Sequence, residues 1–326
     1  MNTTKIISLS GAVLLALTST CLAAGHGQLE YVYTTVYAGP PESPGTTWFG
    51  INNSGELVGN RSFPAITVAT ILDEGILTTW SATLPDGSPS PWNEFTGVND
   101  NGVIVGDYFD ESFTLAYDFI RSRHGDITLL PPVEPGAFFV DENLGINNEG
   151  TVVGTFTLDP NWLSDWPAFV PQGFILKHGK YTTWAYPGAS AVGTFFAAIN
   201  DKGTIAGAWW DAAKNFHAFL LNKDGSTTSI EPPASLSPAV PADSFAVALN
   251  DNDEVLVWYN YQDDATGATI SSSFLLSHGI YTQIQLPNPQ YPIDTLTYAN
   301  SINDEGEIAG AYGPNESEGF VATPVH

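Results

Sequence analysis

The chain has 326 residues, of which 43% are hydrophobic and only 13% charged, and 35 acidic against 9 basic residues give a formal net charge of −26. Contacts to phosphate need Lys and Arg, so this charge argues against nucleic acid and against an anionic bilayer as partners. It is compatible with a neutral sugar, a cationic ligand or a divalent cation. The acids are spread along the chain, which favours solubility in a crowded or salty exterior as their main role.

The first 24 residues have the features of an export signal. Lys5 precedes an apolar stretch over residues 6–17, and Ala23 and Ala24 form a cleavage site before Gly25. The stretch is too short and too rich in Ser and Thr for a retained membrane helix. Cys21 could mark a lipoprotein, but Thr20 is larger than the residue that such a site prefers. We therefore expect a cleaved signal peptide over 1–24, one domain over 25–326, and a secreted or periplasmic protein without membrane insertion.

Six copies of one ten-residue pattern follow along the rest of the chain. Each copy has a small residue, an aliphatic residue, Asn, then Asn or Asp, and in most copies a Gly and an aliphatic run that ends on a second Gly. The repeated asparagines are Asn52, Asn99, Asn147, Asn200, Asn250 and Asn303, at steps of 47, 48, 53, 50 and 53 residues. A period near fifty residues is typical of one four-stranded blade of a β-propeller.

The order of residues inside each copy predicts the strands of a blade. The Asn-Asx-x-Gly segment is turn chemistry and indicates a hairpin between strands a and b. The Gly that ends strand b suits a bulge or a close backbone approach. An apolar strand c then leads to a second turn, such as His178-Gly179, and to a hydroxyl-rich strand d, such as residues 181–187. We predict an all-β chain folded as a six-bladed propeller of four-stranded antiparallel blades.

The two ends of the chain predict how the ring closes. The sixth copy has strands a, b and c, but no strand d follows before His326. Residues 31–37 resemble the other d strands and have no a, b or c strand before them. We expect this N-terminal strand to complete the last blade, which removes two sheet edges.

The repeat also resembles a known family. The I-N-D-x-G-x-[IV]-x-G core followed by His217-Ala218-Phe219 is similar to the HAF-type extracellular repeat family, named for that tripeptide. The tripeptide is complete once; the other copies with an aligned position have Tyr117, Gln172, Ser272 and Glu318 in place of the His. The resemblance implies an exported propeller-like array and no particular catalytic residue.

Variable loops on a rigid scaffold are where binding usually occurs. In this repeat the b–c and d–a connections vary, whereas the a–b and c–d turns are short and regular, so we expect the site on the variable face or at its central funnel. Tryptophans and two nearby carboxylates in these loops suit a carbohydrate surface, because sugar C–H faces pack on rings. The candidates are Trp92, Trp162, Trp166, Trp209, Trp210, Trp258, Asp107 and Asp211. The alternative is that the rings fill gaps between blades.

Carboxylates at the start of strand a offer the weaker catalytic alternative. Glu94, Glu142 and Asp243 are expected near the channel mouth, where two of them could act as acid and base on a glycoside or hold calcium. The histidines lie mostly in c–d turns or at the termini and show no spacing of a triad or zinc site. We expect no metal or cofactor, with structural calcium as the minor alternative.

Two functions follow from these features. The favoured one is a monomeric binding or interaction protein whose ligand is an extracellular polysaccharide or glycoconjugate, or else an extracellular protein. The alternative is a glycan-acting hydrolase or lyase that uses the carboxylates at the channel mouth. Binding is favoured because the sequence contains no catalytic constellation while the repeat and the loop aromatics are evident.

Overall fold

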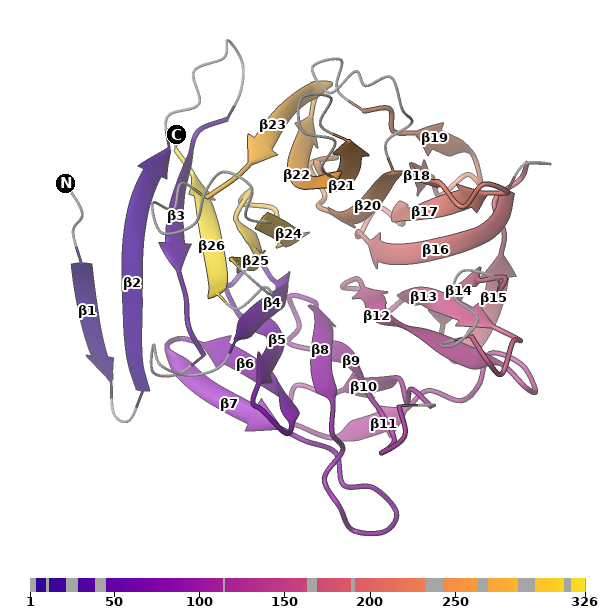
Figure 1. The fold of residues 1–326 in the computed structure, drawn as a ribbon, viewed down its shortest axis with the longest axis horizontal. Coiled ribbons are helices and arrows are strands. Elements are labelled where there is room, and N and C mark those ends of the chain that lie inside the picture. The colour runs from indigo at the N-terminus through magenta and orange to yellow at the C-terminus, as the bar shows by residue number, and fades with distance from the viewer. Residues whose placement is uncertain are drawn as a thin grey trace.

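The computed structural model describes residues 4–9, 12–21, 29–38, 45–113, 115–162, 169–188, 191–232, 243–262, 269–286, 297–313 and 318–325, and every regular element among them is a β-strand. In this described part, no helix is long and apolar enough to cross a membrane. The strands form antiparallel sheets that stand around a central axis as the blades of a ring (Figure 1). The predicted six-bladed propeller is confirmed.

Each blade runs from an innermost strand a to an outermost strand d. Blade 1 consists of β4 (Thr46–Ile51), β5 (Leu57–Ser62), β6 (Thr67–Asp73) and β7 (Ile76–Trp80). Blade 2 consists of β8 (Asn93–Val98), β9 (Ile104–Tyr108), β10 (Phe119–Arg121) and β11 (Ile127–Leu129). Blade 3 consists of β12 (Phe138–Ile146), β13 (Val152–Thr157), β14 (Gln172–Lys177) and β15 (Lys180–Trp184).

The second half of the ring repeats this order. Blade 4 consists of β16 (Ala191–Ile199), β17 (Ile205–Asp211), β18 (Phe216–Leu221) and β19 (Thr227–Ser229). Blade 5 consists of β20 (Asp243–Leu249), β21 (Val255–Gln262), β22 (Thr269–Ser277) and β23 (Ile280–Ile284). Blade 6 consists of β24 (Thr297–Ile302), β25 (Ile308–Tyr312), β26 (Glu318–Pro324) and, from the other end of the chain, β3 (Tyr31–Thr35).

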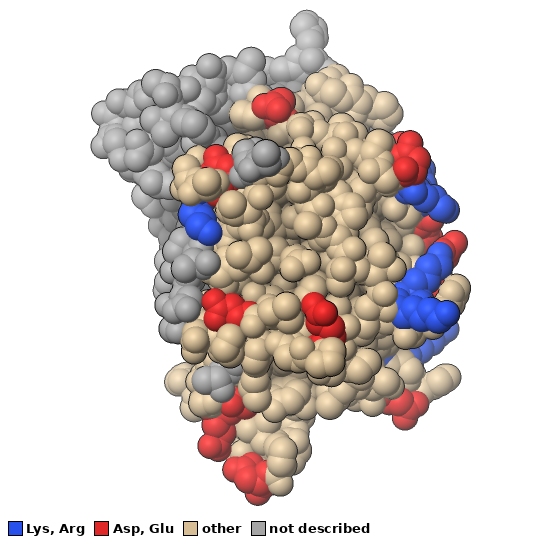
Figure 2. Space-filling view, turned by 90° about the vertical axis from the view of Figure 1, so that its right-hand side faces the viewer, with Lys and Arg blue, Asp and Glu red and all other residues tan. Residues whose placement is uncertain are grey.

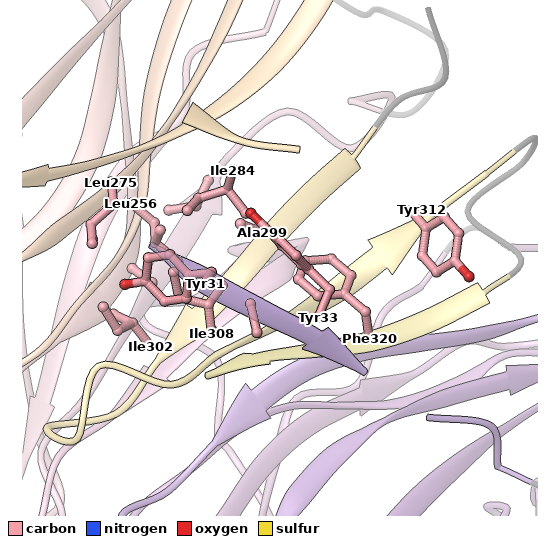
Figure 3. Packing of buried hydrophobic residues seen from close by; sticks show 13 residues of the cluster. Tyr31, Tyr33, Leu256, Leu275, Ile284, Ala299, Ile302, Ile308, Tyr312 and Phe320 are labelled. Atoms are coloured by element: carbon pink, nitrogen blue, oxygen red, sulfur yellow. The ribbon is translucent and has the colours of Figure 1, made fainter. Parts of the chain in front are cut away.

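The N-terminal strand closes the ring as predicted. β3 pairs antiparallel with β26, with Tyr33 opposite Ala322. Tyr31 and Tyr33 are buried among Leu256 and Leu275 of blade 5 and residues of blade 6 (Figure 3). The closing strand therefore supplies both backbone pairing and apolar surface, and it places β3, from the first part of the chain, beside β26, the last strand (Figure 1).

Two further strands extend blade 6 outward. β2 (Ala12–Cys21) pairs with β3, and β1 (Thr4–Leu9) pairs with β2, so this sheet has six strands. These strands coincide with the segment that the sequence marks as an export signal. Cleavage after residue 24 remains a prediction, and it would leave the four strands of blade 6 intact.

The glycines at the ends of the b strands have a steric reason. Pairing between strands a and b shifts register at a bulge, for example between Trp48 and Gly50. This brings the carbonyl of Thr47 within 2.0 Å of where a Cβ of Gly59 would lie. A side chain at Gly59 would collide with this backbone, as it would at Gly106, Gly207 and Gly310, whereas blade 5 has Val257 at the equivalent position.

Each contact between neighbouring blades forms its own apolar core. Val58 and Ala69 of blade 1 pack with Phe95 and Phe119 of blade 2, and the other blade junctions hold comparable clusters. Phe219, the last residue of the His-Ala-Phe tripeptide, is fully buried in such a cluster between blades 3 and 4. The Phe of the tripeptide is therefore a core residue that packs between blades.

Candidate functional site

The six repeated asparagines form a closed ring of hydrogen bonds at one end of the central channel. Each donates its Nδ2 to the backbone carbonyl of the next asparagine, at 2.9–3.1 Å, and Asn303 completes the cycle by donating to Asn52. The Oδ1 of each asparagine accepts from the backbone of its own turn, as Asn52 does from the amide of Glu56. All six are buried, so these side chains join the blades to one another.

The residues that follow the asparagines form a second ring. Each backbone amide donates to the side-chain Oδ1 of the equivalent residue in the next blade, at 2.7–2.9 Å. The members are Asn53, Asp100, Asn148, Asp201, Asp251 and Asp304. The amide groups of Asn53 and Asn148 each donate to the Oδ2 atoms of the two neighbouring aspartates.

Asp251 is the exception in this second ring. It lies between Asp201 and Asp304, whereas every other aspartate of the ring has an asparagine on one side or both. Burial raises the pKa of the Asp251 carboxyl, and the charges of Asp304 and Asp201 raise it further, against a lowering by the backbone amide of Asp201. The second ring is therefore complete in hydrogen bonds, but at blade 5 the carboxylate of Asp251 is repelled by those of Asp201 and Asp304.

Among the described residues, the opposite end of the channel has no such ring. It opens as a small funnel of about 80 Å³, and the residues that face it differ from blade to blade: Phe49, Thr96, Leu144, Ala197, Val247, Asn300 and, from β21, Trp258. The Nε1 of Trp258 donates to the Ala299 carbonyl at 2.9 Å. Of the tryptophans proposed from the sequence, Trp258 is the one that faces this funnel.

The remaining candidate tryptophans divide into packed and partly exposed rings. Trp162 and Trp210 are buried, at 4% and 0% exposure, in one aromatic cluster with Phe169 and Phe195, so both are core residues here. Trp209 is half-buried, and two rings already stack on it, Tyr186 at 4.8 Å and His217 at 4.2 Å between centroids. Trp92 is half-buried beside blade 1, and Trp166 lies outside the described residues.

The candidate carboxylates are not arranged as an acid–base pair that a substrate could reach. Glu94 and Asp107 face each other across β8 and β9, each with 1% of its surface exposed, and Asn60 donates to Glu94 at 2.9 Å. Asp243 accepts the amide of Phe216 at 2.9 Å, and Asp211 accepts the amides of Ala213 and Asn215. The side chain of Glu142 is outside the described part of β12.

No metal centre emerges from the residues that the structure describes. Among them, no three His, Cys, Asp or Glu side chains converge as a metal site would require. The aspartates of the second ring accept hydrogen bonds from backbone amides of neighbouring blades. Their positions are therefore explained by interblade contacts.

A cavity of about 300 Å³ lies between blades 3 and 4, on the face of the a–b and c–d turns. Its floor is largely apolar and includes Ile175, Trp184, Ile205 and Leu221. Its polar lining includes Glu149, Thr151, Lys177, Asn222 and Lys223. We call this cavity the 3/4 cleft. Figure 2, which views this side of the ring, shows the lysine and arginine side chains gathered mostly along one margin, with acidic groups beside them.

Charges at the rim of the 3/4 cleft are coupled. Lys177 and Glu149 form a salt bridge of 2.7 Å. The hydrogen bond and charge of Lys177 lower the pKa of the Glu149 carboxyl, with smaller contributions from Lys223 and His178. Lys223 itself forms no salt bridge with any described residue. Both side chains of the Lys177–Glu149 pair are about half exposed, so a ligand can reach them.

The 3/4 cleft lacks a glutamate that three other blades carry beside the ring asparagine. Four residues after the ring asparagine, blades 1, 5 and 6 have Glu56, Glu254 and Glu307, whose carboxylates accept the Nδ2 of that asparagine. A Cβ built on Gly102 of blade 2 would lie 3.7 Å from Glu56 Oε2, so this carboxylate reaches the next blade. Blade 3 has Thr151 instead, and the three atoms nearest to a Cβ built on the equivalent Gly203 of blade 4 all belong to Lys223, at 3.5–3.9 Å.

The expectation that placed the site on the variable face did not include this cleft. Its residues come from segments that the sequence explains as hairpin turns, and the cavity exists only where two blades meet. The detectable signal is a departure from the repeat: Thr151 in place of Glu at the fourth position after the asparagine, together with Trp184 at the end of strand d.

Comparison with known proteins identifies the fold. No family model and no curated protein matches the chain. Among solved structures, a fucoside complex of the Aleuria aurantia lectin matches with a TM-score of 0.53 at 10% identity, over 87% of this chain and 95% of the lectin. A further Aleuria aurantia lectin structure, described as a six-bladed β-propeller with a novel fucose recognition mode, gives 0.52 at 11% identity over 82% and 87%. At these identities, the likeness establishes the six-bladed fold and nothing about this chain's ligand.

Proposed function

We propose that this protein is an exported propeller that binds an extracellular polysaccharide or glycoconjugate. The observation that carries the proposal is the 3/4 cleft. Its volume of about 300 Å³ is at the lower end of the range for small-molecule sites, ~300–1,000 Å³. Its apolar floor and its polar lining, which includes the carboxylates of Glu149 and Asp201 and the ammonium groups of Lys177 and Lys223, match the two surfaces of a sugar. Export rests on the N-terminal sequence, and the resemblance to the HAF-type repeat family is compatible with it.

Binding is favoured over glycan cleavage because of where the carboxylates lie. A glycosidase needs two carboxyl groups that flank the scissile bond. Glu94 and Asp107 are buried, and Asp243 accepts a backbone amide. At the cleft, Glu149 is held in a salt bridge with Lys177, and its lowered pKa makes it a poor general acid. A propeller fold also occurs in the fucose-binding lectins named above, which makes a lectin role physically reasonable for this scaffold.

Retention on immobilised polysaccharides tests the proposal. The mature protein is passed over a panel of neutral and acidic polysaccharides at about 0.15 M NaCl, and the eluted polymer is examined for new reducing ends and unsaturated products. We expect retention on at least one polymer without either product. Retention with chain cleavage would favour the enzyme, and no retention on any polymer would overturn glycan binding.

Two substitutions locate the site in the same assay. Thr151→Glu introduces the residue that blades 1, 5 and 6 carry at this position and should fill the 3/4 cleft, so retention should be lost. Thr204→Glu makes the same change in blade 4 and should leave retention intact. Trp258→Ala tests the funnel, and loss of retention in this variant alone would move the site to the variable face.

A further inference from the structure

The 3/4 cleft lacks a carboxylate that the junction between blades 1 and 2 has at the equivalent position, Glu56. In the latter, both Arg123 and the carboxylate of Glu56 lie within 4 Å of where a Cβ of Gly102 would be. The charges of Arg121 and Arg123 lower the pKa of Glu56, although burial and Asp73 raise it by more. A basic side chain and a carboxylate thus meet at this turn within the protein itself.

The 3/4 cleft has a basic side chain equivalent to Arg123 but no carboxylate equivalent to that of Glu56. Lys223 lies against Gly203 as Arg123 lies against Gly102, with its Cδ 3.5 Å from where a Cβ of Gly203 would be. The residue that corresponds to Glu56 is Thr151, which cannot reach the ammonium group. Glu149, the nearest acid on the rim, is held by Lys177 at 2.7 Å.

Thr151 provides a second, independent indication of a ligand. The residue is 4% exposed and lines the cavity, and its Oγ1 is buried with no hydrogen-bond partner among the described residues. A buried hydroxyl without a partner is costly, by roughly 1–3 kcal/mol, and rotation of the Thr151 side chain toward the cavity would let a ligand hydroxyl or carboxylate satisfy it.

We propose that the 3/4 cleft binds a single acidic sugar residue, a uronate at the end or on a side branch of a glycan. Its carboxylate takes the place that Glu56 occupies between blades 1 and 2 and contacts Lys223. A hydroxyl or carboxylate oxygen meets Thr151 Oγ1, and the apolar face of the ring lies on the floor that Trp184 and Leu221 help to form. The cavity volume accommodates one sugar rather than an extended chain. This inference rests on the proposed function.

The net charge of −26 does not prevent such binding. At about 0.15 M ionic strength the Debye length is about 8 Å, so acids on distant blades are largely screened while a contact with Lys223 is not. The turns around the cleft also carry Lys177 and Lys202, so this part of the ring is less acidic than the chain as a whole.

Paired monosaccharides test the inference by titration calorimetry at about 0.15 M NaCl. The probes are galacturonate with galactose and glucuronate with glucose, each pair differing in one carboxylate. We expect one uronate to bind at least tenfold more tightly than its neutral partner. Equal affinity within both pairs, or no uronate binding up to tens of millimolar, would overturn the inference.

Variants assign the preference to the cleft. Lys223→Gln should remove the preference for the uronate and leave weak binding of the neutral sugar, while Lys202→Gln, which removes a lysine paired with Asp253 on the surface, should keep it. A uronate preference that survives Lys223→Gln would contradict the assignment. Retention of neutral polysaccharides without any uronate preference would leave glycan binding standing and remove only the acidic ligand, so the two failures are distinguishable.

Discussion

The cleft between blades 1 and 2 and the cleft between blades 3 and 4 are built from the same parts of the repeat. Both have a tryptophan at the end of strand d, Trp80 and Trp184, and both have a basic residue beside the turn of the next blade. In the first, Glu56 extends across the junction, whereas in the second Thr151 leaves a cavity. Departures from a structural repeat can therefore leave a cavity between two blades without disturbing the scaffold.

Both junctions depend on an intact ring of blades, so the largest loss of stability should come from opening that ring. Deleting residues 25–40 removes β3, with Tyr31 and Tyr33 from the core between blades 5 and 6. This loss is comparable to the ~5–15 kcal/mol of total stability of a folded domain, so cooperative unfolding should disappear in a thermal melt. Tyr33→Ala should retain a cooperative transition but lose about 3–5 kcal/mol. A deleted protein that melts like the intact one would contradict closure by β3.

A smaller effect should follow from opening the hydrogen-bonded ring at one blade. Asn200→Ala removes the donor to the Asn250 carbonyl, in a buried hydrogen bond, and the acceptor of the Thr204 amide, in a partly buried one. We expect a loss of about 2–4 kcal/mol in denaturant unfolding. Asn222→Ala, at an exposed turn of the same blade, is the control and should change stability by less than about 1 kcal/mol. Equal effects of the two would mean that the ring adds nothing.

Giving the junction between blades 1 and 2 the residue that blade 3 has at this position should create a second binding site. Glu56→Thr should open the cleft between blades 1 and 2 beside Arg123, at a cost of about 1 kcal/mol for the hydrogen bond lost with Asn52. The calorimetric stoichiometry for the uronate should then rise from one site toward two. An unchanged stoichiometry in a folded variant would show that the missing glutamate alone does not create a site.

The smallest effect concerns the strained position of the second ring. Asp251→Asn should place an amide between Asp201 and Asp304, as Asn53 and Asn148 already do between their neighbours, for a gain of about 1 kcal/mol near neutral pH. The folded pKa of Asp251 is raised, so its contribution favours folding below the unfolded pKa of about 3.9 and is lost as pH rises through the folded pKa. The gain from Asp251→Asn should therefore shrink in acid. A gain that does not depend on pH would contradict this cause.

The sequence predicted the architecture well because the repeat reports it directly. The spacing of Asn52, Asn99 and their equivalents gave the number of blades, and the unmatched strand at residues 31–37 gave the closure. These features depend on contacts within one blade or on counting strands. Chemistry that is local in sequence, such as the positive-φ turn at His178-Gly179, is also readable without a structure.

The candidate site was harder to predict because it depends on contacts between blades. Trp210 and Trp162 lie in variable segments but are buried by residues that come from neighbouring parts of the ring. Glu94 and Asp107 were proposed separately, and only the strand register shows that they face each other inside a blade. Thr151 has no distinctive chemistry of its own. Its importance for the site depends on Lys223, which is distant in sequence but lines the same cavity.

The asparagine ring has a consequence for how such a chain can change over time. All six side chains donate in the same rotational sense, so each asparagine serves one neighbour as donor and the other as acceptor through its carbonyl. A substitution at one copy removes the side-chain donor to the next blade and leaves the buried carbonyl of that blade without this partner, so every copy is constrained. The position four residues later is under no such mutual constraint, and it is there that the copies have diverged into Glu, Val and Thr. Duplication followed by divergence can therefore change the residues between blades while the asparagine ring stays uniform.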